Sequence, residues 1–360
     1  MLVKNQLLSL KAYEPGKSVE EIKKDYGLAK ITKLNSNENP YGSSPKAAEA
    51  LANLSSQFAI YPDGGAMNLR AKVASHLDVD EDQIIFGAGL DEVIQIISRA
   101  LLTPDSNTVM ASPTFSQYKL HAVIEGAEIR EIATVDGCHD LNTMLSQIDS
   151  QTRIVWICNP NNPTGTYVNE TALKNFISRV PKETLVVIDE AYYEYVTAED
   201  FPHSLSLLKD FDNVMVLRTF SKAYGLAGLR VGYGVGNKEF IQRLEVTRLP
   251  FNTSRLAQIA AEAALEDQDF IQGCVKINEK GLNELQAFCK RHKIDFYPSQ
   301  ANFIFIKTDK GHELYESLLQ KGYIVRLFPN GIRITIGTEE ENKNLLADFE
   351  DIIVKAGTPN

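Results

Sequence analysis

Residues 214–235, VMVLRTFSKAYGLAGLRVGYGV, place a lysine between two apolar runs that read as buried strands. A lysine that follows a buried strand is poorly hydrated, which lowers its pKa, so the neutral amine of Lys222 can form a Schiff base with an aldehyde. The hydroxyls of Thr219 and Ser221 and the guanidinium of Arg230 suit a phosphate group. The stretch therefore predicts a site for an aldehyde that carries a phosphate, although a solvated loop lysine would also fit the stretch on its own.

Pyridoxal 5′-phosphate (PLP) is an aldehyde of this kind, and other strand ends carry groups that suit it. Asp189 follows the apolar run 185–188, where a buried carboxylate can pair with the protonated pyridine nitrogen that lets PLP act as an electron sink. Tyr192 and Asn162 can hydrogen-bond to its phenolic oxygen, and Phe115 can stack on its ring. Taken alone, Asp189 also fits an ordinary helix cap and Phe115 fits plain core packing.

Apolar strand patterns alternate with helical patterns from residue 84 to residue 235. This alternation predicts parallel βαβ units, with helices on both faces of one sheet. Open α/β sheets bind ligands at the carboxyl ends of their strands, so polar loops at these ends are expected to converge on one site. Five such loops follow Phe86, Ala111, Cys158, Ile188 and Leu217. The glycines at 87 and 89 lie between a strand and a helix, a pattern typical of an anion site.

The pattern changes after Thr253, where long helices are followed by short strands. We therefore expect an α/β protein with a large, ligand-binding domain at residues 41–251. Residues 1–40 and 252–360 are expected to form a smaller α+β domain.

Two arginines of the smaller domain, Arg326 and Arg333, lie at the ends of neighbouring predicted strands. If they face the predicted ligand site, they would bind a carboxylate or phosphate of a substrate. If they face water, they would be ordinary solvated residues.

Composition limits the possible partners. The 360-residue chain has a net charge of −10, with 44% hydrophobic and 23% charged residues. The negative charge argues against nucleic acid or an anionic membrane as the main partner. We see neither a signal peptide nor an apolar run of membrane-spanning length. The four cysteines and six histidines are scattered without a metal-binding motif, so we expect a cytoplasmic protein with no metal.

The motifs resemble those of the fold-type-I PLP-dependent aminotransferases. This resemblance rests on residues 161–165, 189–192 and 221–230, whose order and spacing cover most of the large domain. A finer resemblance is to the histidinol-phosphate aminotransferase family, through residues 34–40, 61–63, 218–222, 302–303 and 332–337. It implies a large domain with a mostly parallel seven-stranded sheet and a homodimer with shared active sites. The implied reaction is transamination between histidinol phosphate and 2-oxoglutarate, in histidine biosynthesis.

The resemblance also implies a role for each site residue. Lys222 would bind PLP covalently and move a proton between the substrate Cα and the cofactor, while Asp189 pairs with the pyridinium and Tyr192 and Asn162 bind the phenolic oxygen. The other implied cofactor contacts are Phe115 at the ring, Gly89, Leu90, Asp91, Thr219, Ser221 and Arg230 at the phosphate, and Tyr61 at the phosphate bound by the neighbouring subunit. The implied substrate contacts are Arg333, with Asn162, Arg326 and Tyr13.

Other functions remain open at this level. An aromatic amino acid aminotransferase, or an enzyme of dual specificity, is the main alternative, because imidazole and phenyl rings have similar shapes. A PLP-dependent decarboxylase of a phosphorylated amino acid shares the same motifs. A PLP-binding regulator without turnover would need a DNA-binding domain, and the chain shows no basic patch for one. The loop between Arg326 and Arg333 is also shorter than in many members of the family, which bears on how Arg326 reaches a substrate.

Overall fold

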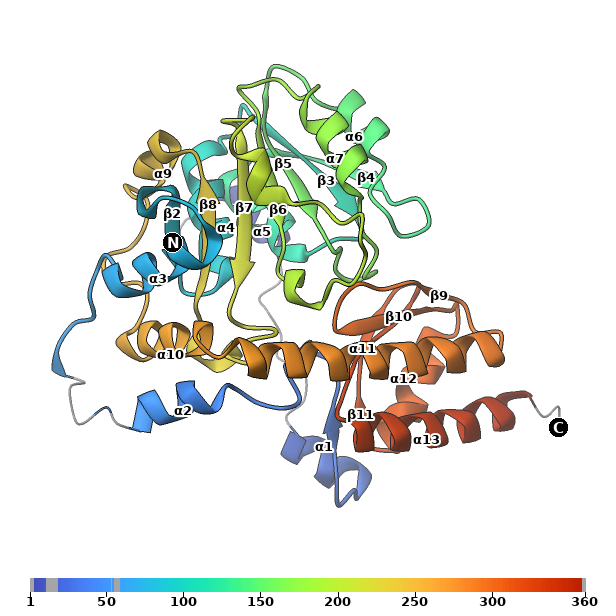
Figure 1. The fold of residues 1–360 in the computed structure, drawn as a ribbon. Coiled ribbons are helices and arrows are strands. Elements are labelled where there is room, and N and C mark those ends of the chain that lie inside the picture. The colour runs from blue at the N-terminus through green and yellow to red at the C-terminus, as the bar shows by residue number, and fades with distance from the viewer. Residues whose placement is uncertain (1–2, 11–18, 53, 55–58, 358–360) are drawn as a thin grey trace.

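The computed structural model describes residues 3–10, 19–52, 54 and 59–357 of the chain. A large central sheet with helices on both faces forms the larger part of the molecule (Figure 1). The long helix α11 (Gln268–Arg291) runs across the molecule from this part to a smaller one, where it packs beside α13 (Glu339–Gly357) (Figure 1).

Among the described residues, the central sheet has seven strands, and most of its pairs are parallel, as predicted. In spatial order the strands are β2 (Ile84–Gly87), β8 (Gly232–Gly236), β7 (Val214–Thr219), β6 (Leu185–Asp189), β5 (Thr152–Cys158), β3 (Asn107–Ser112) and β4 (Glu128–Ala133). Strand β8 is antiparallel to both of its neighbours. The segment between β7 and β8 contains only the short η5 (Ala227–Leu229) and no crossover helix, so the chain turns back beside β7.

Both faces of the sheet are buried, which is why its central strands are almost entirely apolar. On one face, side chains such as Trp156 and Leu217 pack against α4 (Leu90–Leu101), α5 (Ser116–Glu125) and α9 (Lys238–Leu244). On the other, alternate side chains such as Val155 and Ile188 pack against α6 (Leu141–Ser146), α7 (Glu170–Ile177) and α8 (Ser204–Leu207). Side chains of β2 and β8 on this second face meet α3 (Met67–Leu77) and α10 (Arg255–Leu265).

The smaller part contains a sheet of four antiparallel strands within the described residues: β12 (Arg326–Phe328), β13 (Gly331–Thr335), β10 (Phe303–Lys307) and β9 (Phe296–Tyr297). The N-terminal β1 (Thr32–Lys33) pairs in parallel with β11 (Tyr323–Ile324). The remaining elements are η1 (Asn5–Ser9), α1 (Val19–Tyr26), α2 (Pro45–Ala52), η3 (Glu81–Gln83), η4 (Tyr193–Tyr195) and α12 (Gly311–Gln320).

The β1–β11 pair joins the N-terminal segment to the C-terminal part of the chain. Helix α10, by contrast, lies after residue 252 but packs against α2 and shares a core with Phe86 and Phe220 of the larger part. The domain limits at residues 41 and 252 stay a prediction.

Candidate active site

The carboxyl ends of three central strands meet at one edge of the sheet. Cys158 at the end of β5 is paired with Asp189 at the end of β6, and Asp189 is paired with Leu217 of β7. The loops that follow these strands carry Asn162, Tyr192 and Lys222. The predicted convergence of polar loops at this edge is therefore confirmed for the loops that follow Cys158, Ile188 and Leu217.

Asp189 is a buried carboxylate with a side-chain partner that sequence reasoning missed. The hydroxyl of Tyr118 donates a hydrogen bond of 2.6 Å to its Oδ2, and the amide of Ala191 donates one of 3.1 Å to Oδ1. Tyr118 is itself fixed by stacking on Trp156, with ring centroids 4.6 Å apart. Burial raises the pKa of Asp189 to about 6, against the hydrogen bond from Tyr118, which lowers it. A cationic partner, such as a protonated ring nitrogen, would favour its ionised form.

Lys222 lies in the loop after β7, and its Nζ donates a hydrogen bond of 3.2 Å to the carbonyl of Ser36. The same Nζ lies 5.7 Å from the centre of the Tyr192 ring. Burial, together with the charge of Arg333, lowers the pKa of Lys222 to about 8. Its amine is therefore a far better nucleophile at neutral pH than that of a solvated lysine.

The hydroxyl of Tyr192 connects the two parts of the molecule. It accepts hydrogen bonds from Nδ2 of Asn37 at 3.0 Å and from Nδ2 of Asn162 at 3.3 Å. Oδ1 of Asn162 in turn accepts a hydrogen bond of 2.5 Å from Nη1 of Arg333. Tyr192, Asn162 and Arg333, which sequence reasoning placed in one site, are thus in direct contact.

Gly89 and Arg230 form the edge of an anion site at the N-terminus of α4. Gly89 has a φ of +80°, and a Cβ atom there would collide with the guanidinium of Arg230. Nη1 of Arg230 lies 3.2 Å from the hydroxyl of Ser221, and Nη2 lies 3.4 Å from Oδ2 of Asp91. The backbone amides of Leu90 and Asp91 in the first turn of α4, a half-exposed guanidinium and the Ser221 hydroxyl together suit a phosphate.

Thr219 stands close by at the end of β7, where its hydroxyl accepts a hydrogen bond of 3.1 Å from the amide of Ser221. Phe115 lies edge-on to Tyr118, with ring centroids 5.6 Å apart, and so lies next to the partner of Asp189.

Arg333 is buried, with 7% of its surface exposed. Its Nη2 donates a hydrogen bond of 2.7 Å to the carbonyl of Asn35, while its buried Nε has no hydrogen-bond partner among the described residues. Arg326 is exposed and lies directly opposite Arg333 in the β12–β13 pair. The short connection between these arginines is a tight hairpin closed by Pro329 and Asn330, which keeps the two cations on neighbouring strands.

Tyr61 has 75% of its surface exposed, and its ring stacks on that of Phe251, with ring centroids 4.7 Å apart. Tyr13 lies outside the described residues, so the structure gives no account of it.

An ion pair that sequence reasoning missed lies directly behind the site. Nη2 of Arg218 contacts Oε2 of Glu190 at 2.8 Å, and both side chains are buried. Glu190 follows Asp189, and Arg218 precedes Thr219, so the pair ties together two strand ends that carry site residues. The sequence signal that could have predicted this ion pair is a charged residue of opposite sign at the end of each of two adjacent buried strands.

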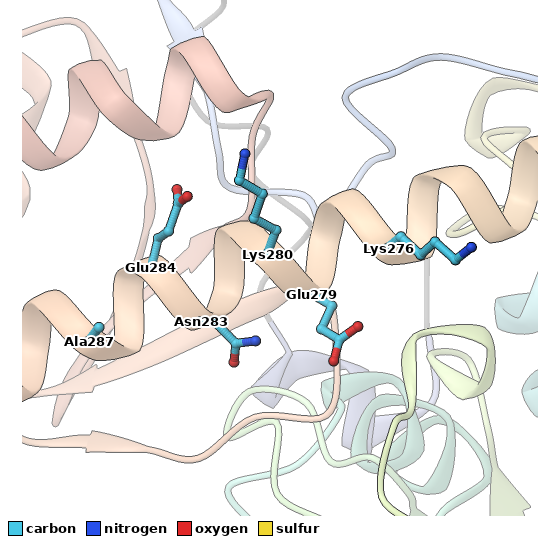
Figure 2. A pocket seen from close by; sticks show the side chains of 6 residues that line it. All are labelled: Lys276, Glu279, Lys280, Asn283, Glu284 and Ala287. Atoms are coloured by element: carbon cyan, nitrogen blue, oxygen red, sulfur yellow. The ribbon is translucent and has the colours of Figure 1, made fainter.

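A hollow on the outer surface of α11 contains none of these groups (Figure 2). Figure 2 shows Lys280 and Glu284 on one side of the helix and Glu279 and Asn283 on the other. Lys280 is exposed and pairs with Glu339 of α13 at 2.6 Å, as expected for a solvated helix face. Among the described residues there is also no cluster of metal-ligand side chains, and no helix is long and apolar enough to cross a membrane.

PLP fits the side chains at the strand ends. The buried carboxylate of Asp189 can pair with the ring nitrogen. The amine of Lys222, whose pKa is lowered, can react with the aldehyde. The space beside Gly89 and Arg230 can hold the phosphate. The orphaned Nε of Arg333 leaves a donor for the anionic end of a substrate.

A family model described as aminotransferase class I and II matches residues 29–349. The fold and the site thus define an aminotransferase.

Histidinol-phosphate aminotransferase 1 of Bacillus thuringiensis subsp. konkukian is 60% identical, over 98% of this chain and 97% of its own. Histidinol-phosphate aminotransferase of a Geobacillus species is 57% identical, over 96% of each chain. The solved structure of histidinol-phosphate aminotransferase from Sinorhizobium meliloti, in complex with pyridoxal-5′-phosphate, is 26% identical, has a TM-score of 0.90, and covers 99% of this chain and 98% of its own. The chain belongs to the class I and II aminotransferases and, within them, to the histidinol-phosphate aminotransferase family.

Proposed function

We propose that the chain is a PLP-dependent transaminase that exchanges an amino group between histidinol phosphate and 2-oxoglutarate, in the biosynthesis of L-histidine. The arrangement of Lys222, Asp189 and Arg333 around one strand edge carries this proposal. The relatives of 56–60% identity that bear the name histidinol-phosphate aminotransferase support it further.

When bound, PLP supplies an electron sink that stabilises negative charge at the substrate Cα. Lys222 would provide the amine that holds the cofactor aldehyde, and its free amine would move a proton between the substrate Cα and the cofactor. The carboxylate of Asp189 holds the ring nitrogen in its protonated state, and the hydroxyl of Tyr192 and the amide of Asn162 hold the phenolic oxygen. Arg230, Ser221 and Thr219 bind the cofactor phosphate, and Phe115 covers the ring.

Arg333 binds the anionic end of the substrate, with Arg326 as a second cation on the facing strand. Two neighbouring guanidinium groups suit a dianionic phosphate better than a single carboxylate, since each can donate two parallel hydrogen bonds. This pairing favours a phosphorylated substrate over an aromatic amino acid.

The substrate assignment can be tested by single-turnover absorbance measurements. The PLP-loaded protein would be mixed separately with L-histidinol phosphate, L-phenylalanine and L-threonine phosphate, and the loss of the cofactor's visible band would be timed. We expect histidinol phosphate to react fastest. Comparable rates with phenylalanine would instead identify a broad or aromatic enzyme, and release of carbon dioxide from threonine phosphate would identify a decarboxylase.

We further propose a homodimer in which Tyr61 reaches the phosphate bound by the partner subunit. Tyr61 is exposed, and so are its apolar neighbours Ile60 and Phe251, which suits a surface covered by a second copy. A mixture of Lys222→Ala and Tyr61→Ala chains, unfolded and refolded together, would contain dimers with one intact site. Recovery of activity in the mixture supports shared sites. A mixture as inactive as the Lys222→Ala protein alone would contradict them, because full activity would then require both residues in the same chain.

We also propose a cytoplasmic location. All four cysteines fall in the described part of the chain, and all are free thiols there.

A further inference from the structure

The Tyr192 hydroxyl has two amide donors, and their orientations can be worked out from the groups behind them. Nη1 of Arg333 can only donate, so the atom of Asn162 that it contacts must be Oδ1. The remaining atom of that amide, Nδ2, therefore faces the hydroxyl of Tyr192 and donates to it.

The same argument applies to Asn37. The hydroxyl oxygen of Thr335 accepts a hydrogen bond of 3.0 Å from the backbone amide of Asn37. Its proton is then free to be donated to Oδ1 of Asn37, which lies 2.9 Å away. Nδ2 of Asn37 is thereby left to donate to the hydroxyl of Tyr192 at 3.0 Å.

Two amide donors engage both lone pairs of the phenolic oxygen of Tyr192, so this oxygen has no acceptor capacity left. Burial raises the pKa of Tyr192 to about 12, so the hydroxyl keeps its proton at neutral pH. Among the residues that the structure describes, no hydrogen bond takes this proton. Nζ of Lys222 lies 5.7 Å from the centre of the Tyr192 ring.

We propose that Asn37 is a positioning residue: together with Asn162 it occupies the acceptor side of the Tyr192 hydroxyl, and so commits the proton of Tyr192 to an oxyanion in the site. If the proposed function holds, on which this inference rests, that oxyanion is the phenolic oxygen of PLP.

The side-chain amide of Asn37 is held in its orientation more firmly than that of Asn162. Asn162 is oriented by Arg333, the residue that is proposed to bind the substrate. Asn37 is instead oriented by Thr335, and its carbonyl accepts a hydrogen bond of 3.0 Å from the buried Asn302. Its φ of +55° is one that asparagine tolerates better than most residues. Asn37 therefore keeps its orientation when Arg333 changes partner.

The inference is tested by titrating the visible absorption of the PLP-loaded protein against pH. A donor to the phenolic oxygen stabilises the form of the chromophore in which that oxygen carries the most negative charge, which is the deprotonated one. Loss of the donor therefore raises the apparent pKa of the chromophore. We expect Asn37→Asp to raise it by about one to two units, because a carboxylate at this position accepts the proton of Tyr192.

Two comparisons separate this effect from the added charge. Asn37→Asp should shift the apparent pKa much less in a Tyr192→Phe background, where there is no proton to redirect. Thr335→Val, which adds no charge, frees the amide of Asn37 to turn and should also raise the apparent pKa, whereas Thr335→Ser keeps the hydroxyl and should match the wild type.

An equal shift by Asn37→Asp in both backgrounds would show a charge effect alone and overturn the inference. So would a Thr335→Val protein that titrates like Thr335→Ser, and this pair decides the matter if Asn37→Asp does not fold. A wild-type protein that gains no visible band with PLP would remove the proposed function itself, and the inference with it.

Discussion

The hydroxyl of Tyr118 lies 2.6 Å from Oδ2 of Asp189, and both side chains are buried beneath the carboxyl edge of the central sheet. Tyr118 comes from α5 and Asp189 from the end of β6, so the contact depends on how that helix packs on the sheet. It is the side-chain hydrogen bond that opposes the effect of burial on the carboxylate, which otherwise favours the neutral acid.

Tyr118→Phe should weaken PLP binding at acidic pH. Burial raises the pKa of Asp189 from 3.8 to about 6, and without the hydroxyl this pKa rises further. Only the ionised carboxylate can pair with a protonated ring nitrogen, so the acidic loss of PLP affinity should begin at a higher pH in the variant. The measurement is PLP affinity of the apoprotein from about pH 5 to about pH 8. Tyr167→Phe is the matched control, because Tyr167 makes an equally short but exposed hydrogen bond with Asp200, and identical pH profiles for both variants would refute the prediction.

Lys222→Ala should abolish transamination while leaving the fold intact. The lysine supplies the proton transfer at the substrate Cα, and loss of such a step alone costs roughly 10²–10⁴-fold in rate. Single-turnover kinetics and circular dichroism check both halves of the prediction, with the exposed Lys238→Ala as control. Near-wild-type turnover by Lys222→Ala would remove the central claim.

The lowered pKa of Lys222 predicts how the stability of the apoprotein depends on pH. The folded pKa is about 8 and the reference value is 10.5, so between these values the unfolded chain binds a proton that the folded protein has lost. Stability therefore rises with pH in this window, because the cost of the buried ammonium disappears. Urea unfolding at about pH 7 and about pH 10 should show Lys222→Met more stable than the wild type, by a margin that shrinks at the higher pH. A margin independent of pH would contradict this account.

Arg230→Ala should weaken PLP binding without affecting the fold. Charge-assisted hydrogen bonds contribute about 1.5–3 kcal/mol, which corresponds to roughly a ten- to hundredfold rise in Kd. Fluorescence or calorimetric titration of the apoprotein measures this change. Arg243→Ala is the control, since Arg243 is also exposed but lies on α9, which follows β8 where the end of that strand pairs with the start of β7. Unchanged PLP affinity in Arg230→Ala would exclude this arginine from the phosphate site.

Glu190→Ala should destabilise the protein strongly, because it leaves Arg218 buried without its partner. Removing one member of a buried ion pair costs about 3–5 kcal/mol of unfolding free energy. The double substitution Glu190→Met/Arg218→Met should be far less harmful, since no unpaired charge remains. Urea unfolding of the three proteins is the measurement, and equal losses in the single and double variants would show that the pair acts through packing alone.

Sequence reasoning located the main chemical groups of the site because their placement is local. Lys222, Asp189 and Asn162 each follow an apolar run, and parallel strands bring their carboxyl ends to one edge whatever the details of packing. Gly89 was likewise visible from its position between a strand and a helix. The small-domain sheet was less visible: Arg326 begins a separate strand, β12, which the pattern did not predict, because three residues are too few to show an alternation.

The amino-acid sequence by itself determined the class of the sheet and the order of its strand-end motifs. Only the tertiary structure decided which groups contact the site residues. Each of these contacts joins residues that are distant in the chain. The separation is 71 residues for Tyr118 and Asp189, 28 for Arg218 and Glu190, and 298 for Thr335 and Asn37. The physical reason is that hydrophobic periodicity reports which face of an element is buried, whereas a hydrogen bond between distant residues depends on how whole elements pack in register.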